Sequence, residues 1–189
     1  MTNSAFSVSG AGAGSWILIT TASASSSASI AFTGLTSTYV AYCVTIANMV
    51  PSNANNYLIM QTSSNNGSSY DSGASNYQWV IQSTLNTSNY ITSSLGDTKI
   101  VLSDTSYTMP AAGSTTGCAG NIYIYNPSST STLTQVSSFL AYQETGSLNY
   151  PAVSIVNGSR LSTTGVNAIQ FLMSSNNIAS GLFHLYGLS

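Results

Sequence analysis

The stretch ASIAFTGLTSTYVAYCVTIANMV, from Ala28 to Val50, decides the fold of this chain. It contains two apolar runs, Ile30–Phe32 and Tyr39–Val50, separated by a turn that carries Gly34. In the second run, large residues occupy one parity and smaller residues the other, which is the pattern of a strand with one face in a core. The β-branched and aromatic content favours the same assignment. We therefore predict that Tyr39–Val50 is a long central strand against which other strands register.

The alternation within this run also predicts which side chains face the core. The parity predicted to face inward consists of Val40, Tyr42, Val44, Ile46, Asn48 and Val50. The opposite parity consists of Tyr39, Ala41, Cys43, Thr45, Ala47 and Met49. The larger aliphatic groups of the first set fit a core, and the smaller groups of the second fit a partly solvated face.

Short apolar segments separated by polar turns continue along the rest of the chain. Ser, Thr, Asn and Gly are weak helix formers, and no window shows a helical period. The further predicted strands are Trp16–Thr20, Tyr57–Thr62, Tyr77–Ser83, Ser88–Thr92, Lys99–Leu102, Asn121–Tyr125, Leu133–Tyr142, Ala152–Val156, Leu161–Thr163, Val166–Met173 and Gly181–Tyr186. We predict an all-β fold without a major helix: an antiparallel β-sandwich, jelly-roll-like, with about ten strands.

Two Asn-Gly pairs predict tight hairpins, because this dipeptide supplies the positive φ angles of a type I′ turn. They are Asn66-Gly67, and Asn157-Gly158 between Ala152–Val156 and Leu161–Thr163. Asp71 is predicted to bond nearby backbone N–H groups in an Asx-turn.

We expect one domain over residues 16–189, preceded by a flexible or extended arm over residues 1–15, which are small and Gly-rich. Cys43 is expected to be a small buried hydrophobic residue. Whether it pairs with Cys118, the other cysteine, stays open on the sequence alone. No apolar run approaches the roughly 20 residues that a membrane-spanning helix needs.

Charged residues make up only 3% of the 189 residues, where a soluble domain has about 25%. The ionisable set is Asp71, Asp97, Lys99, Asp104, Glu144, Arg160 and the lone His184. Two basic residues cannot neutralise a run of phosphates or hold an anionic membrane, so neither nucleic acid nor membrane is an expected partner. Little charge repulsion opposes self-association, and sheet edges lack the charges that usually protect them.

The same scarcity argues against catalysis, and we expect no catalytic, cofactor-binding or metal-binding residues. Asp97 and Asp104 are expected to flank a strand as solvated carboxylates, and a metal site needs more converging ligands. His184 alternates within the last strand and is expected to be a structural histidine. The twelve tyrosines, with Trp16 or Trp79, either pack in the sandwich and its interfaces or stack on sugars.

Three segments carry a family resemblance. They are Ile30–Leu35 (IAFTGL) with Ser37–Tyr39 (STY), continuing through Val50-Pro51; Gln61–Tyr77 (QTSSNNGSSYDSGASNY); and Gly181–Gly187 (GLFHLYG). On these segments the chain resembles a group of bacteriophage virion proteins. It departs from them at Val40, where an aspartate is common, and at Gln61, where an arginine is common.

The resemblance implies a non-enzymatic structural protein of the virion, either a capsid decoration or a head-fibre component. It also implies symmetric copies, with a trimer favoured, and contact with other virion proteins such as the major capsid protein or a fibre. The alternative is a tail-fibre or receptor-binding module that recognises a host surface glycan through exposed aromatic residues. The resembling motifs are turns and strands, and they carry over no catalytic residue.

Overall fold

The computed structural model describes residues 14–111, 117–145 and 150–188. These residues form twelve strands and, within the described ranges, no helix. The strands are β1 (Trp16–Ser27), β2 (Ile30–Thr33), β3 (Ala41–Pro51), β4 (Leu58–Ser63), β5 (Tyr77–Leu85), β6 (Ser88–Asp97), β7 (Ile100–Val101), β8 (Cys118–Tyr125), β9 (Gln135–Gln143), β10 (Pro151–Arg160), β11 (Ala168–Met173) and β12 (Ile178–Leu188).

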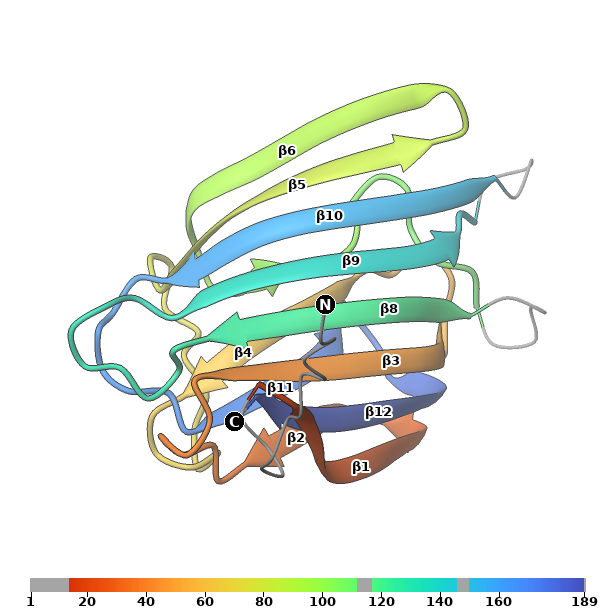
Figure 1. Cartoon of the computed structure of the whole chain (residues 1–189). Coiled ribbons are helices and arrows are strands. Elements are labelled where there is room, and N and C mark those ends of the chain that lie inside the picture. Colours follow the sequence, from red (N-terminus) through yellow and green to blue (C-terminus); the bar gives the residue numbers. More distant parts are fainter. Residues whose placement is uncertain (1–13, 112–116, 146–149, 189) are drawn as a thin grey trace, which may run out of the picture.

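The strands form two antiparallel sheets, which confirms the predicted all-β sandwich. The larger sheet has eight strands in the order β1-β12-β3-β8-β9-β10-β5-β6, and the smaller has four in the order β2-β11-β4-β7. Figure 1 shows the larger sheet face on, with the smaller sheet behind it. The twelve strands of the described residues compare with about ten in the prediction. Residues 1–13 of the predicted 1–15 arm lie outside the described part, and β1 begins at Trp16 as expected.

The predicted central strand corresponds to β3, which pairs with β12 on one side and β8 on the other. Val44 and Ile46 face the core as expected, and Val44 is 0% exposed. The predicted alternation is wrong at Val40, which precedes β3 and is 61% exposed. It is also wrong beyond Ile46, because Asn48 has a φ of 50° and the pairing with β8 shifts there. This bulge inserts one residue and turns Met49, instead of Val50, into the core.

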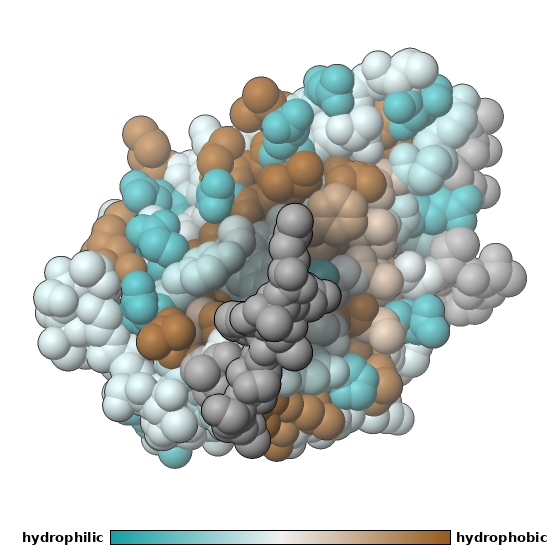
Figure 2. All heavy atoms as spheres, in the orientation of Figure 1, coloured by the Kyte–Doolittle hydropathy of each residue, from teal (hydrophilic) through white to brown (hydrophobic). Residues whose placement is uncertain are grey.

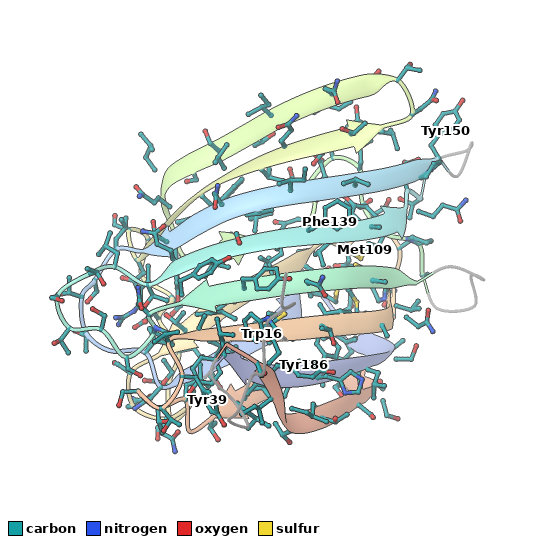
Figure 3. The ribbon with its side chains drawn as sticks, in the orientation of Figure 1. Trp16, Tyr39, Met109, Phe139, Tyr150 and Tyr186 are labelled. Atoms are coloured by element: carbon teal, nitrogen blue, oxygen red, sulfur yellow. The ribbon has the colours of Figure 1, made fainter. Side chains whose placement is uncertain are left out.

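The core lies between the two sheets and is almost entirely aliphatic and aromatic. Phe171 of β11 packs on Phe183 of β12 with ring centroids 5.9 Å apart, which joins the two sheets. Tyr42 of β3 is buried, and its hydroxyl donates a hydrogen bond to the carbonyl of Thr36 at 2.9 Å. Met109, labelled in Figure 3, lies in the same core. The buried tyrosine therefore satisfies its polar end locally.

The hairpin predicted at Asn157-Gly158 is wrong. Both residues lie inside β10, which runs unbroken from Pro151 to Arg160, and Leu161–Thr163 is not a strand. A Cβ atom at Gly158 would lie 2.8 Å from Cγ2 of Ile100. Glycine stands there because β7 approaches the backbone of β10 closely, which is the other common reason for glycine within a strand.

The Asn66-Gly67 pair does adopt the predicted positive φ angles, 56° and 84°. It does not close a hairpin, because β4 pairs with β11 and β7 instead of with the next strand, β5. The Asn66 side chain accepts a hydrogen bond from the backbone N–H of Gly34 at 2.8 Å. The turn therefore fixes the end of β2 against the loop that follows β4.

Replacing Gly120 with alanine is expected to destabilise the fold by about 3 kcal/mol. Gly120 opposes the start of the β3 bulge, has a φ of 151°, and would place a Cβ 3.0 Å from the Cα of Leu140 and still closer to the carbonyl oxygen of Phe139. Urea unfolding followed by tryptophan fluorescence measures the change. Gly165→Ala is the control, because its Cβ would come no closer than 3.3 Å to Ser128; equal losses in the two variants would contradict the prediction.

Candidate functional site

The face of the eight-stranded sheet that points away from the smaller sheet is the candidate functional surface, and we call it the outer face. Strand pairing aligns its side chains in rows that cross the whole sheet. One row consists of Ile91, Gln82, Ile155, Phe139, Asn121, Thr45, His184 and Thr21. Because side chains alternate along each strand, the neighbours of these residues face the core instead.

Large apolar side chains lie exposed on this face. Ile91 is 73% exposed and Leu95 is 86% exposed, and about half of each of Phe139 and Ile155 is exposed. Figure 2 shows apolar residues spread among polar ones over this side of the molecule. Single exposed apolar residues are common on proteins, but an apolar group on most strands of one sheet face marks an interaction surface.

No Asp, Glu, Lys or Arg side chain points outward from the described part of this sheet. Two of the charged residues, Asp97 and Arg160, end β6 and β10 on the core side. Lys99 pairs with Asp97 at 3.0 Å, and Arg160 pairs with Asp71 at 2.6 Å. The outer face therefore offers apolar groups, hydroxyls and amides to a partner, and no ionic group.

An aromatic hollow lies at the β1 side of the outer face. Trp16 packs against Tyr123 with ring centroids 5.8 Å apart. The hollow has a volume of about 270 Å³, and Tyr186 and Asn121 also line it. Figure 3 shows Trp16 and Tyr186 projecting from neighbouring strands. Aromatic rings beside an amide are suited to stacking and hydrogen bonding with a neutral polar ligand.

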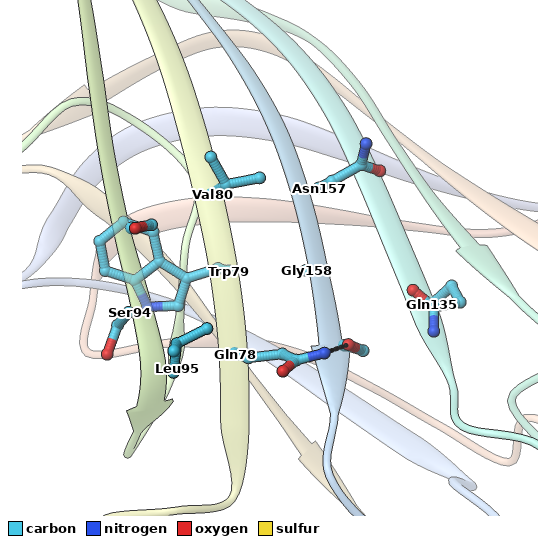
Figure 4. A pocket seen from close by; sticks show the side chains of 10 residues that line it. Gln78, Trp79, Val80, Ser94, Leu95, Gln135, Asn157 and Gly158 are labelled. Carbon is cyan, nitrogen blue, oxygen red and sulfur yellow. Dashed lines mark hydrogen bonds between the residues drawn. The ribbon is translucent and has the colours of Figure 1, made fainter.

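A second hollow of about 420 Å³ lies between β6, β5 and β10. Val80, Leu95 and Asn157 line it, and Gln78 donates a hydrogen bond to the Ser159 hydroxyl at 3.0 Å (Figure 4). This second hollow is open to solvent, and no ionic side chain of the described residues lines it. It can therefore bind apolar groups of a partner but offers no charged acid or base for catalysis.

Trp79, which the sequence offered as an exposed stacking residue, is buried. Its indole N–H donates a hydrogen bond to Oδ2 of Asp97 at 2.9 Å. Partial burial raises the pKa of Asp97, but the hydrogen bonds from Lys99 and Trp79 outweigh it and hold the pKa below its usual value. Trp16 is therefore the tryptophan that the outer face presents.

The histidine and the remaining acids do not converge. His184 lies on the outer face, and its Nδ1 is 2.9 Å from the Thr21 hydroxyl. Asp104 flanks β7 as expected but is buried instead of solvated, and its Oδ1 accepts the N–H groups of Ser106 and Tyr107. Among the described residues, no group of three or more His, Cys, Asp or Glu could hold a metal ion.

Asp71 does not form the predicted Asx-turn. Its Oδ2 accepts hydrogen bonds from Nε of Arg160 at 2.6 Å and from the Thr62 hydroxyl at 3.0 Å. The Tyr77 hydroxyl donates to the Asp71 carbonyl, and burial raises the pKa of Tyr77 to about 12. Because Thr62 belongs to β4 and Arg160 to β10, this cluster ties the two sheets together.

The two cysteines are both free and do not form a disulfide. Cys43 lies under the aromatic residues of the outer face, opposite Tyr123 and Tyr186, whereas Cys118 faces the core. Burial raises the pKa of Cys43 to about 11 and that of Cys118 to about 12.

Both thiols are expected to resist modification in the folded protein. A rise in pKa from about 8.5 to the value of Cys43 lowers the thiolate fraction at pH 8 by roughly two orders of magnitude, and the thiolate is the reactive form. The rate of reaction with a chromogenic disulfide at pH 8, before and after unfolding in guanidinium, measures this. Cys43→Ser and Cys118→Ser assign the signals, and a fast phase from either thiol in the folded chain would contradict the expectation.

Comparison with protein-family models, with curated proteins and with solved structures yields no match for this chain. In the part of the chain that the structure describes, no helix is long and apolar enough to cross a membrane. The candidate function therefore rests on the geometry of the outer face and the sheet edges, together with the resemblance carried by the quoted segments.

Proposed function

We propose that this chain is a non-enzymatic structural protein of a bacteriophage virion, a self-associating β-sandwich that decorates the capsid or forms part of a head fibre. The observation that carries the proposal is an outer face with apolar groups on most of its strands and no outward ionic group among the described residues. Such a face favours contact with other copies or with equally neutral neighbours, because nothing charged has to lose its hydration.

The free edges of the larger sheet support the same proposal. β1 and β6 are its edge strands, and neither carries Lys, Arg or Pro to block pairing with another chain. Edge strands of monomeric proteins are usually protected by such residues. A protein that functions as one of many packed copies does not need this protection.

The test is the state of the purified chain in solution and its place in the particle. Sedimentation at micromolar concentration is expected to show an oligomer whose size changes little between low and high salt, since few charges face one another. Mass spectrometry of purified phage particles is expected to find the chain at a fixed copy number. A clean monomer, or absence from the particle, would overturn the proposal.

A second candidate function is recognition of a host surface glycan, and the aromatic hollow favours it. Trp16, Tyr123 and Tyr186 provide ring faces on which sugars stack, and Asn121 provides a donor and an acceptor beside them. Binding to a glycan array that is lost in Trp16→Ala, and kept in a Trp79→Phe variant, would favour this function. An array without signal would leave the structural role as the better account.

A further inference from the structure

We infer that β6 is the strand through which two copies of this chain associate, by pairing antiparallel with β6 of a second copy so that the two larger sheets become continuous. The inference rests on the proposed self-association and names the contact. Three observations support it: the exposure of β6 to solvent, the strands that β6 contacts, and the positions of its two exposed aliphatic residues.

β6 stands outside the sandwich. None of its ten residues, Ser88–Asp97, is buried, and side chains on both of its faces are open to solvent. The smaller sheet ends at β7, which packs against β5 and β10, so β6 extends beyond the second layer (Figure 1). β6 is therefore held by β5 on one side only, and its other edge is open to a further strand.

The edge of β6 also offers a template for strand addition. Half of its backbone N–H and C=O groups point away from β5, as in any edge strand, and can bond to another strand. Its one irregularity lies near the end, where Ser94 pairs with Trp79 and Asp97 pairs with Tyr77. Asp97, its only charged residue, is engaged with Lys99 and does not guard the edge.

The opposite edge is less suited to the same contact. β1 shifts register between Leu18 and Thr20, in its first half. It also packs against β2 of the smaller sheet, and its Trp16 ring is already placed on Tyr123. β6 also has one ring contact outside its sheet, between Tyr90 and Tyr107 with centroids 4.5 Å apart, but it packs less against the strands of the smaller sheet than β1 does.

The apolar residues of β6 favour one register. A twofold axis normal to the sheet keeps both outer faces on the same side, so that outward residues pair with outward residues. If Ser93 sits on that axis opposite its own copy, Ile91 lies opposite Leu95 of the second copy, and Leu95 opposite Ile91. Both of these side chains are then covered by an apolar neighbour, which is the kind of cross-strand pair that stabilises a sheet.

A second copy is also the partner that fits the charge of this edge. The outward residues of β6 and β5 near the contact, such as Val80, Gln82 and Ser93, carry no charge, so an acidic or basic partner would find no counter-charge. Two identical neutral edges meet without repulsion. The contact is isologous and closes on itself, so it gives pairs of copies instead of open filaments.

Disulfide trapping tests the contact and its register. In Ser93→Cys, the introduced thiols of two copies meet at the twofold axis, and mild oxidation is expected to give a covalent dimer on a non-reducing gel. In Thr92→Cys, the thiols lie on the other face and diagonal to each other, so they exceed the Cα separation that a disulfide allows, and little dimer is expected. The unmodified chain, with its two buried thiols, is the control for unspecific oxidation.

Charge insertion gives an independent test on a folded protein. Ile91→Lys and Leu95→Lys place a charge at positions that are largely exposed in the single chain, so the circular dichroism spectrum is expected to stay unchanged, whereas the dissociation constant of the pair rises at least tenfold. Leu18→Lys on the outer face of β1 is the matched control and is expected to leave association intact.

The outcomes separate the contact from the proposed function. An oligomer that persists in Ile91→Lys, without cross-linking of Ser93→Cys, would overturn the β6 contact and leave self-association standing. Loss of association in Leu18→Lys as well would indicate head-to-tail pairing of β6 with β1, as a ring of three copies requires, and would also overturn it. A monomer in every variant and in the unmodified chain would overturn both proposals.

Discussion

A chain in which Val44 is replaced by aspartate is expected to lose about 4 kcal/mol or more of folding free energy, which approaches the whole stability of many domains. Val44 is fully buried in the middle of β3, between β12 and β8, and faces the core. An ionised carboxylate there would have no partner and no water. Circular dichroism and urea unfolding are expected to show a chain that is largely unfolded at room temperature.

The matched control is Ala47→Asp, three residues along the same strand. Ala47 is exposed on the outer face, opposite Leu182 of β12, so the introduced carboxylate stays in water. Its expected cost is below about 1 kcal/mol, as for most surface substitutions. Equal stability of the two variants would show that β3 does not face the core in this register.

The second large effect is expected for Arg160→Met, which removes the charge from the inter-sheet cluster. Arg160 is 5% exposed, and its guanidinium donates both to Asp71 and to the carbonyl of Thr164, at 2.6 and 2.5 Å. Removing the guanidinium leaves the Asp71 carboxylate, whose side chain is 24% exposed, without its counter-charge and frees the Thr164 carbonyl, at a cost of about 3 kcal/mol. The free energy of unfolding from a urea titration measures this loss.

A double-mutant cycle isolates the pair from the packing of the arginine stem. Asp71→Asn removes the acceptor charge, and the double variant Arg160→Met/Asp71→Asn leaves no unpaired ion. The double variant is expected to be more stable than Arg160→Met alone, because its neutral amide is easier to bury than a lone carboxylate. Strict additivity of the two single losses would mean that the two side chains do not stabilise each other.

The all-β class of the fold can be predicted from the sequence because the alternation of apolar and polar residues is a local property of each strand. Val44 and Ile46 face the core where the period of two places them. The bulge at Asn48 could not be predicted from that period, since one inserted residue in the left-handed region reverses the parity and Met49 replaces Val50 in the core. The local signal for it is Asn48 itself, because asparagine adopts positive φ angles more often than most residues do.

Contacts between distant segments account for the remaining differences. The pair Asn157-Gly158 carries a strong turn signal, but Gly158 instead makes room for Ile100, which lies far away in sequence. The Asp71 carboxylate could bond its own backbone, but Arg160 reaches it from the other sheet. The outer face could be predicted only in part: the sequence showed the missing charges, whereas the two free edges depend on the strand order.

The strand order has a consequence for how the chain acquires its structure. β1 pairs within its sheet only with β12, and β2 pairs only with β11. These two strands therefore pair only after β11 and β12 have formed. During synthesis they have no partner in these sheets until β11 and β12, residues 168–188, have been made. A nascent chain therefore exposes the apolar segments Trp16–Ile19 and Ile30–Phe32 for most of that time. We expect the pairing of β11 and β12 to be a late and slow step of folding, because it joins strands that lie far apart in the sequence.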